Sequence, residues 1–156
     1  MRTLAWVALI IFVVDQVSKY YIVHMLNLAT VRAIDVWPPY LNLRMAWNYG
    51  INFGLLATDS DVTRWALIVV ALVISGAVIW WLRREPGGLW QNISAGLLVG
   101  GALGNVVDRV WYGAVADFLN MSCCGFTNPY AFNVADISIF IGAFGLVIFT
   151  PDKKPA

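Results

Sequence analysis

The chain has 156 residues, of which 60% are hydrophobic and only 12% are charged. A typical soluble domain is about 45–50% apolar and about 25% charged, so the composition indicates a membrane protein and the length suits one domain. The net charge of +1 supplies no basic patch, which argues against nucleic acid as a partner.

The sequence contains no pattern for a metal site or a disulfide framework. The only cysteines, Cys123 and Cys124, are adjacent, and neighbouring cysteines rarely form a structural disulfide. The single histidine, His24, has no second histidine or Cys-x-x-Cys pair beside it, so we interpret it as an interfacial residue. We expect no metal and no cofactor, and assign the two cysteines no role.

The first apolar segment covers about residues 3–24. Its beginning could pass for the apolar region of a signal peptide, but no small-x-small cleavage site follows. Because about 20 residues cross the hydrocarbon core, we predict a retained transmembrane helix. Asp15 and Lys19 are four residues apart, so they lie on one face of this helix in the favourable order for an ion pair. The pair either tethers the outer end of the helix, which we favour, or orders a polar cavity.

An extramembrane sheet and loop are predicted for about residues 27–60. Trp37-Pro38-Pro39 predicts a stiff turn, because proline fixes φ and restricts the residue before it. The run 40–47 alternates apolar and polar residues, as a half-buried strand does. Gly50 and Gly54 suit the turns that follow.

Three more membrane spans are predicted, at about 62–82, 89–107 and 131–149, with a loop between the last two. The third span repeats glycine every four residues, at Gly96, Gly100 and Gly104, a pattern that lets helix backbones touch. We interpret these glycines as packing residues. The predicted architecture is therefore an all-α bundle of four transmembrane helices with a small extracytoplasmic β-sheet.

Basic residues indicate the orientation of this bundle. Four spans place both termini on one side, and the short segments on that side hold Arg2, Arg83, Arg84, Lys153 and Lys154. The positive-inside rule then places both termini in the cytoplasm. The carboxylates gather at the opposite, outer end of the bundle. Ionisable groups near hydrocarbon face an interior or an aqueous cavity and mark function.

Asn105, Asp108 and Arg109 share one helix face, since they are spaced at i, i+3 and i+4. We favour a structural role for them, with an Asp108–Arg109 ion pair that satisfies loop carbonyls and Asn105 as an interhelical hydrogen-bonding group.

Asp117 and Asp136 differ because neither has a cationic neighbour in the sequence. Asn133 lies on the same helix face as Asp136 and can orient it. Two carboxylates in a low-dielectric site share one proton, so one can take a proton from water while the other binds the scissile carbonyl. The alternative is two unrelated residues of a polar cavity. A proton-coupled carrier predicts charges through the membrane depth and internal repeats, and neither is present; a non-enzymatic scaffold leaves both carboxylates unexplained.

Five motifs occur along the chain: DQVSK (15–19), WNYGINFG (47–54), GGALGNVVDR (100–109), VADF (115–118) and FNVAD (132–136). Together they resemble the motifs of the lipoprotein signal peptidases (signal peptidase II), which are bacterial intramembrane aspartic peptidases. Ile51-Asn52 departs from the usual small residues there. The resemblance implies catalytic aspartates at Asp117 and Asp136, with a supporting polar set of Asp15, Lys19, Asn48, Asn105, Asp108, Arg109 and Asn133.

The same resemblance implies a substrate and a location. The family's substrate is a prolipoprotein that carries diacylglycerol on its lipobox cysteine and is cut just before that cysteine. The implied location is the bacterial inner membrane, with the active site near the outer leaflet. We expect a monomer whose partners are this lipidated precursor and membrane lipids.

Overall fold

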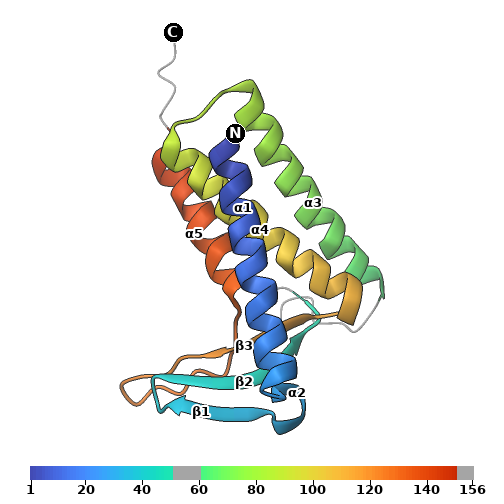
Figure 1. Cartoon of the computed structure of the whole chain (residues 1–156), viewed down its shortest axis with the longest axis vertical. Helices are drawn as coiled ribbons and strands as arrows, with labels where there is room; N and C mark the ends of the chain where they lie inside the picture. Colours follow the sequence, from blue (N-terminus) through green and yellow to red (C-terminus); the bar gives the residue numbers. More distant parts are fainter. Residues whose placement is uncertain (51–60, 151–156) are drawn as a thin grey trace.

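The computed structural model describes residues 1–50 and 61–150. Four longer helices run along the molecule, and a three-stranded sheet closes one end (Figure 1). The predicted loop positions 51–60, among them Ile51-Asn52 and Gly54, lie outside the described residues, as do Lys153 and Lys154 of the tail.

Among the residues that the structure describes, three helices are long and apolar enough to cross a membrane. The first is α1 (Arg2–Lys19), which continues into the π-helical turn η1 (Tyr20–Met25); the others are α3 (Asp61–Arg84) and α4 (Leu89–Tyr112). They confirm that long apolar helices form at the first three predicted spans. The fourth predicted span appears as α5 (Val134–Phe149), a helix of only 16 residues.

Two helix boundaries differ from the sequence-based ones. Helix α4 extends to Tyr112 rather than residue 107, so Asp108 and Arg109 belong to its last turns. It ends at Gly113, whose φ of 81° gives the left-handed C-terminal cap that glycine adopts without strain. Helix α5 begins three residues later than predicted, because Asn133 caps it.

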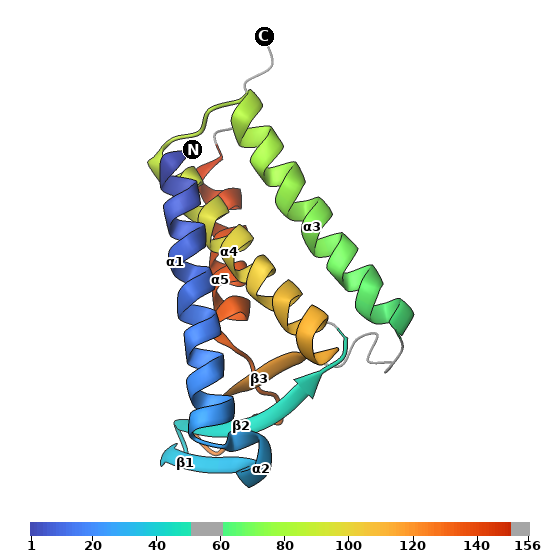
Figure 2. The ribbon, with the colours of Figure 1, turned by 45° about the vertical axis from the view of Figure 1, so that its right-hand side comes forward.

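Helix α4 is the central element, and it packs between α1 and α5 (Figures 1 and 2). Glycines make this approach possible. A Cβ on Gly100 would lie 2.5 Å from the carbonyl oxygen of Ala8 in α1, and one on Gly101 would lie 2.5 Å from that of Ala135. The predicted packing role of the glycine repeat is therefore confirmed. Helix α3 lies outside this trio (Figure 2).

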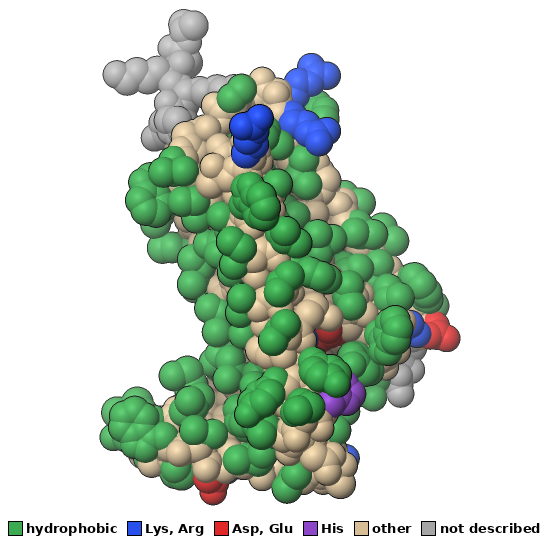
Figure 3. Space-filling view, in the orientation of Figure 1, with side chains coloured by type: hydrophobic (Ala, Val, Ile, Leu, Met, Phe, Trp, Pro, Cys, Tyr) green, Lys and Arg blue, Asp and Glu red, His purple; other side chains and the backbone are tan. Residues whose placement is uncertain are grey.

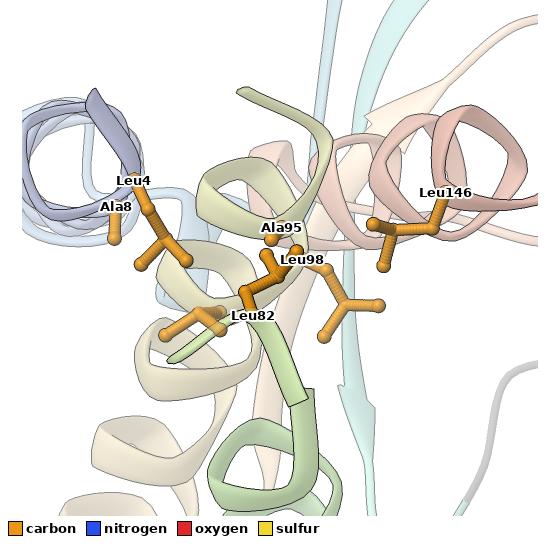
Figure 4. Packing of buried hydrophobic residues seen from close by; sticks show 7 residues of the cluster. Leu4, Ala8, Leu82, Ala95, Leu98 and Leu146 are labelled. Carbon is orange, nitrogen blue, oxygen red and sulfur yellow. The ribbon is translucent and has the colours of Figure 1, made fainter. Parts of the chain in front are cut away.

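Apolar side chains fill the end of the bundle away from the sheet. Leu4, Leu82, Leu98 and Leu146 come from four different helices and are all buried there (Figure 4). The outer surface of the bundle is also apolar, as the hydrophobic side chains of Figure 3 show. Such a surface suits a hydrocarbon environment.

The sheet consists of β1 (Ala33–Trp37), β2 (Leu41–Asn48) and β3 (Val115–Asn120), antiparallel and in that order. The predicted strand at 40–47 is confirmed as β2. The third strand was not predicted, because we assigned residues 115–120 to a loop. These residues pair with β2, Asp117 opposite Ala46.

A short helix, α2 (Leu28–Val31), connects η1 to the sheet. Leu28 is fully buried against Leu43 and Phe118, which fixes the sheet to the end of the first helix. At the other end of the molecule lie the N-terminus, the α3–α4 connection and the end of α5 (Figure 1). Basic side chains gather at that end as well (Figure 3).

Candidate active site

The first turn of α5 is closed by a reciprocal cap. The backbone N–H of Asp136 donates to Asn133 Oδ1 at 2.8 Å, and the backbone N–H of Asn133 donates to Asp136 Oδ2 at 3.3 Å. Asn133 thus orients Asp136, as its spacing predicted. The carboxylate also lies at a helix N-terminus, where the partial positive charge of the helix favours an anion.

Asp117 projects from the middle of β3 and is only 2% exposed. Its Oδ1 accepts a hydrogen bond from Asn133 Nδ2 at 2.7 Å, and its Oδ2 accepts one from Asn48 Nδ2 at 3.1 Å. Burial, followed by the nearby charge of Asp136, raises the pKa of Asp117 to about 8. This carboxyl group therefore holds a proton more readily than a free aspartate does.

Asn133 joins the two carboxyl groups. Its Oδ1 caps α5 at Asp136 while its Nδ2 donates to Asp117, so a single amide with one possible orientation contacts both aspartates. Asn105 supplies a second link, because its Nδ2 donates to Asp136 Oδ1 at 3.0 Å. The Oδ1 of Asn105 accepts from Lys19 Nζ at 3.2 Å and from Asn133 Nδ2 at 3.3 Å, which fixes the orientation of that amide too.

Lys19 lies between two buried carboxylates. Its Nζ is 2.8 Å from Asp15 Oδ2, which confirms the predicted ion pair within the first helix. It is also 2.8 Å from Asp108 Oδ2. All three side chains are buried, at 0–4% exposure. The expected Asp108–Arg109 pair is wrong, because α4 turns Asp108 toward α1, where Lys19 is its cation.

Arg109 instead contacts backbone oxygens. Its Nη2 donates to the carbonyl of Gly50 at 2.8 Å, and its Nη1 donates to that of Asn105 at 3.5 Å. The predicted contact with loop carbonyls is thus confirmed without the ion pair. The guanidinium also attracts the charge of Asp136, so the fold supplies the cation that the local sequence lacks.

Asp15 fixes the position of α5 relative to α1. Its Oδ1 accepts a hydrogen bond from the backbone N–H of Ala135 at 2.9 Å, one of the N–H groups left free at a helix start. A side chain on Gly104 would collide with the carboxylate of Asp15, so this glycine makes room for a polar contact. Asp108 makes the corresponding contact with the sheet, accepting from Ala116 N at 3.1 Å.

The sequence-predicted site residues therefore come together in one polar cluster at the sheet end of the bundle. They are Asp15, Lys19, Asn48, Asn105, Asp108, Arg109, Asp117, Asn133 and Asp136. One member was missed: Gln16 Nε2 donates to Asp15 Oδ2 and to Asp108 Oδ1, both at 3.1 Å. The sequence feature that could have identified Gln16 is its polar amide inside an apolar span, next to an aspartate. Within residues 1–50 and 61–150, no group of three or more carboxylate, histidine or cysteine side chains could hold a metal ion.

A cleft of about 470 Å³ lies between the β1–β2 hairpin and the segment after β3. Asn42 and Arg44 of β2 line it, and so does Ala46, which pairs with Asp117 across the sheet. The Oδ1 of Asn42 is buried and has no hydrogen-bond partner among the residues that the structure describes.

A comparison with known families identifies the chain. The family described as Signal peptidase (SPase) II matches residues 7–150, a range that contains every residue of the polar cluster. The chain belongs to the signal peptidase II family. Its relatives in this family are peptidases, so the family resemblance drawn from the motifs is confirmed.

Individual relatives match along most of their length. Lipoprotein signal peptidase of Shewanella loihica is 38% identical, over 96% of this chain and 88% of the relative. The protein of the same name from Pseudoalteromonas atlantica is 40% identical, over 92% and 85%. A solved bacterial membrane enzyme has a TM-score of 0.79 at 29% identity, covering 95% of this chain and 87% of that one. The fold is therefore that of a bacterial membrane enzyme.

Proposed function

We propose that this protein is an aspartic endopeptidase that removes the signal peptide from diacylglyceryl-modified prolipoproteins, cutting before the lipidated cysteine. The observation that carries the proposal is the pair Asp117 and Asp136, joined through Asn133 at the polar end of an apolar bundle. Membership of the signal peptidase II family supports the substrate class.

The environments of the two aspartates suggest how they divide the chemistry. Asp117 is buried with a pKa of about 8, so it holds the proton. Asp136 is partly exposed, and each of its oxygens accepts a hydrogen bond, from Asn105 and from the N–H of Asn133, so we assign it the role of the base. Asp136 then takes a proton from water as that water attacks the scissile carbonyl carbon. Asp117 donates its proton to the carbonyl oxygen.

Collapse of the tetrahedral intermediate completes the cut. The carbon–nitrogen bond breaks, the oxygen returns its proton to Asp117, and the leaving amine receives the proton that Asp136 took from water. Both aspartates thereby regain their starting states. The remaining cluster residues, Asp15, Lys19, Asn48, Asn105, Asp108 and Arg109, support this geometry.

The proposed topology follows from the charges and the helix lengths. Helix α5 serves as the fourth span, and the basic end of the bundle, with both termini, faces the cytoplasm. The polar cluster then lies near the outer leaflet of the inner membrane. The acyl chains of a lipidated precursor partition into hydrocarbon, which leaves its scissile bond at the polar boundary. A monomer contains all of these groups.

Cleavage of a purified lipidated precursor by Asp117→Asn and Asp136→Asn variants tests the proposal. General acid–base catalysis contributes about 10²–10⁴-fold, so each variant should lose at least about 100-fold in kcat. Asp35→Asn is the matched control, because Asp35 lies on β1 with a 59% exposed side chain and should retain full activity.

Thermal unfolding in detergent establishes that each variant folds. Near-normal turnover by a folded Asp117→Asn or Asp136→Asn variant would remove that residue from the mechanism. Turnover of an unlipidated precursor at the same rate would overturn the substrate class instead.

A further inference from the structure

Cys123 and Cys124 form a close thiol pair that the proposed peptidase chemistry does not use. Both side chains are exposed and unbridged, and their Sγ atoms are 2.8 Å apart. The thiol of Cys123 donates a hydrogen bond to the sulfur of Cys124. The pair therefore differs from two cysteines that are merely neighbours in the sequence.

A tight turn holds the two thiols in place. The backbone N–H of Phe126 donates to the carbonyl of Cys123 at 2.8 Å, and these two residues form an antiparallel bridge. Between them, Cys124 has φ 56° and Gly125 has φ 81°, the two positive values of a type I′ hairpin turn. Positive φ is uncommon outside glycine, and asparagine, aspartate and histidine are the residues most enriched there. Cys124 thus occupies a conformation that its side chain does not favour, as residues at functional sites often do.

The stem of this turn is firmly anchored to the sheet. Asn120 Nδ2 donates to the carbonyls of Asn128 and Tyr130, both at 2.8 Å, and Asn128 N donates to Ser122 Oγ at 3.1 Å. Ser122 and Asn128 also line the cleft between the β1–β2 hairpin and the segment after β3. The thiols are therefore presented on a fixed hairpin rather than on a free loop.

We propose that Cys123 and Cys124 are a reversible redox site, in which the dithiol is oxidised to a vicinal disulfide by exchange with a disulfide oxidant. One thiolate attacks the oxidant R–S–S–R, forming a mixed disulfide and releasing R–S⁻. The second thiolate attacks the cysteine sulfur of that mixed disulfide, which closes the ring and releases a second R–S⁻. The two cysteines lose two electrons and two protons, and the oxidant becomes two R–SH.

Covalent geometry explains why this pair is a reversible site rather than a structural disulfide. Adjacent residues have Cα atoms about 3.8 Å apart, below the range of about 4.4–6.8 Å in ordinary disulfides. A ring closed over that separation is strained and more easily reduced, and strained or exposed disulfides are the labile ones. The site does not depend on the peptidase activity.

Intact mass measured after oxidation tests the proposal on the full-length protein in detergent. Reduced protein is incubated with oxidised glutathione, quenched with acid and treated with a maleimide that labels free thiols. The wild type should lose two hydrogen atoms in mass, carry no glutathione and bind no maleimide, and dithiothreitol should restore both thiols. The single variants Cys123→Ser and Cys124→Ser lack the second thiol, so each should accumulate one bound glutathione.

Phenylarsine oxide provides a second measurement of the same pair. It bridges two thiols through two sulfur–arsenic bonds and releases water, so it should bind the wild type one to one and resist washing, whereas it should wash out of both single variants. Wild-type protein that accumulates glutathione adducts without ring closure, or that forms only dimers linked between chains, would overturn the proposal.

Discussion

Replacing Lys19 by alanine should destabilise the protein more than any other single change in the polar cluster. Lys19 is the cation shared by Asp15 and Asp108, each with an oxygen 2.8 Å from its Nζ. The variant leaves two carboxylates facing each other in a buried space, where they cannot both stay ionised without cost.

The size of the effect follows from the two contacts. At 2.8 Å and an effective dielectric constant of about 20, each contact supplies about 6 kcal/mol of attraction, most of which is cancelled by desolvation. Removing one partner of a buried pair costs about 3–5 kcal/mol, since the remaining charge stays buried. We expect Lys19→Ala to lose that amount of unfolding free energy.

Denaturation in detergent micelles measures this loss of unfolding free energy. Further variants serve as controls that show which contacts the loss comes from. Arg44→Ala breaks the exposed Arg44–Asp35 pair, whose side chains are 40% and 59% exposed, and should cost no more than about 1 kcal/mol. Adding Asp108→Asn to Lys19→Ala removes one of the unpaired charges. This double variant should regain at least about 1 kcal/mol, because residues in one network are coupled.

Two results would refute this reasoning. One is a Lys19→Ala loss no larger than that of Arg44→Ala. The other is a double variant whose loss equals the loss of Lys19→Ala plus that of Asp108→Asn measured alone, which would show that Lys19 and Asp108 do not interact. The pH dependence of cleavage should change little, because Lys19 contributes less to the pKa of Asp117 than burial and Asp136 do.

Three other predictions concern the cap, the packing and the pH dependence. Asn133→Ser preserves a good helix cap but cannot reach Asp117, so the lost buried hydrogen bond should cost about 1–3 kcal/mol of unfolding free energy while kcat falls at least about tenfold; unchanged kcat would contradict the linking role. Gly100→Ala should lower the melting temperature, because its Cβ meets the backbone of α1, whereas Gly76→Ala, with open space around it, should not; equal shifts would contradict the close packing. Cleavage by the wild type should decline as the pH rises through about 8, where Asp117 loses its proton. Asn48→Ala should move this decline to higher pH, because it removes a hydrogen bond that lowers the pKa of Asp117. A pH–rate profile of each protein checks both statements, and a decline that moves to lower pH in Asn48→Ala would contradict them.

Much of the fold could be predicted from the sequence because each helix carries its own signal. The apolar runs gave the first three spans, the glycine repeat gave the packing of α4, and the alternation at 40–47 gave β2. Strand β3 was missed because Val115–Asn120 is buried nearly throughout and shows no alternation. Its identity as a strand depends on pairing with β2, a contact between residues far apart in the chain.

In the site too, contacts between neighbouring residues could be predicted from the sequence and contacts between distant residues could not. The spacing of Asp15 and Lys19, and that of Asn133 and Asp136, fixed two local pairs correctly, because a helix turn alone brings such residues together. Nearness in sequence wrongly favoured Asp108–Arg109. The partner of Asp108 comes from another helix, and only the packing of α4 on α1 brings Lys19 to it.

The shortness of α5 links the proposed site to the thickness of the bilayer. At 1.5 Å per residue its 16 residues span about 24 Å, compared with about 30 Å for a typical hydrocarbon core. With α5 as the fourth span, either Asp136 in its first turn lies several ångströms below the outer boundary, or the lipids thin around it. Lipid chain length would then tune how readily a scissile bond reaches the aspartates, which makes the membrane a determinant of this reaction.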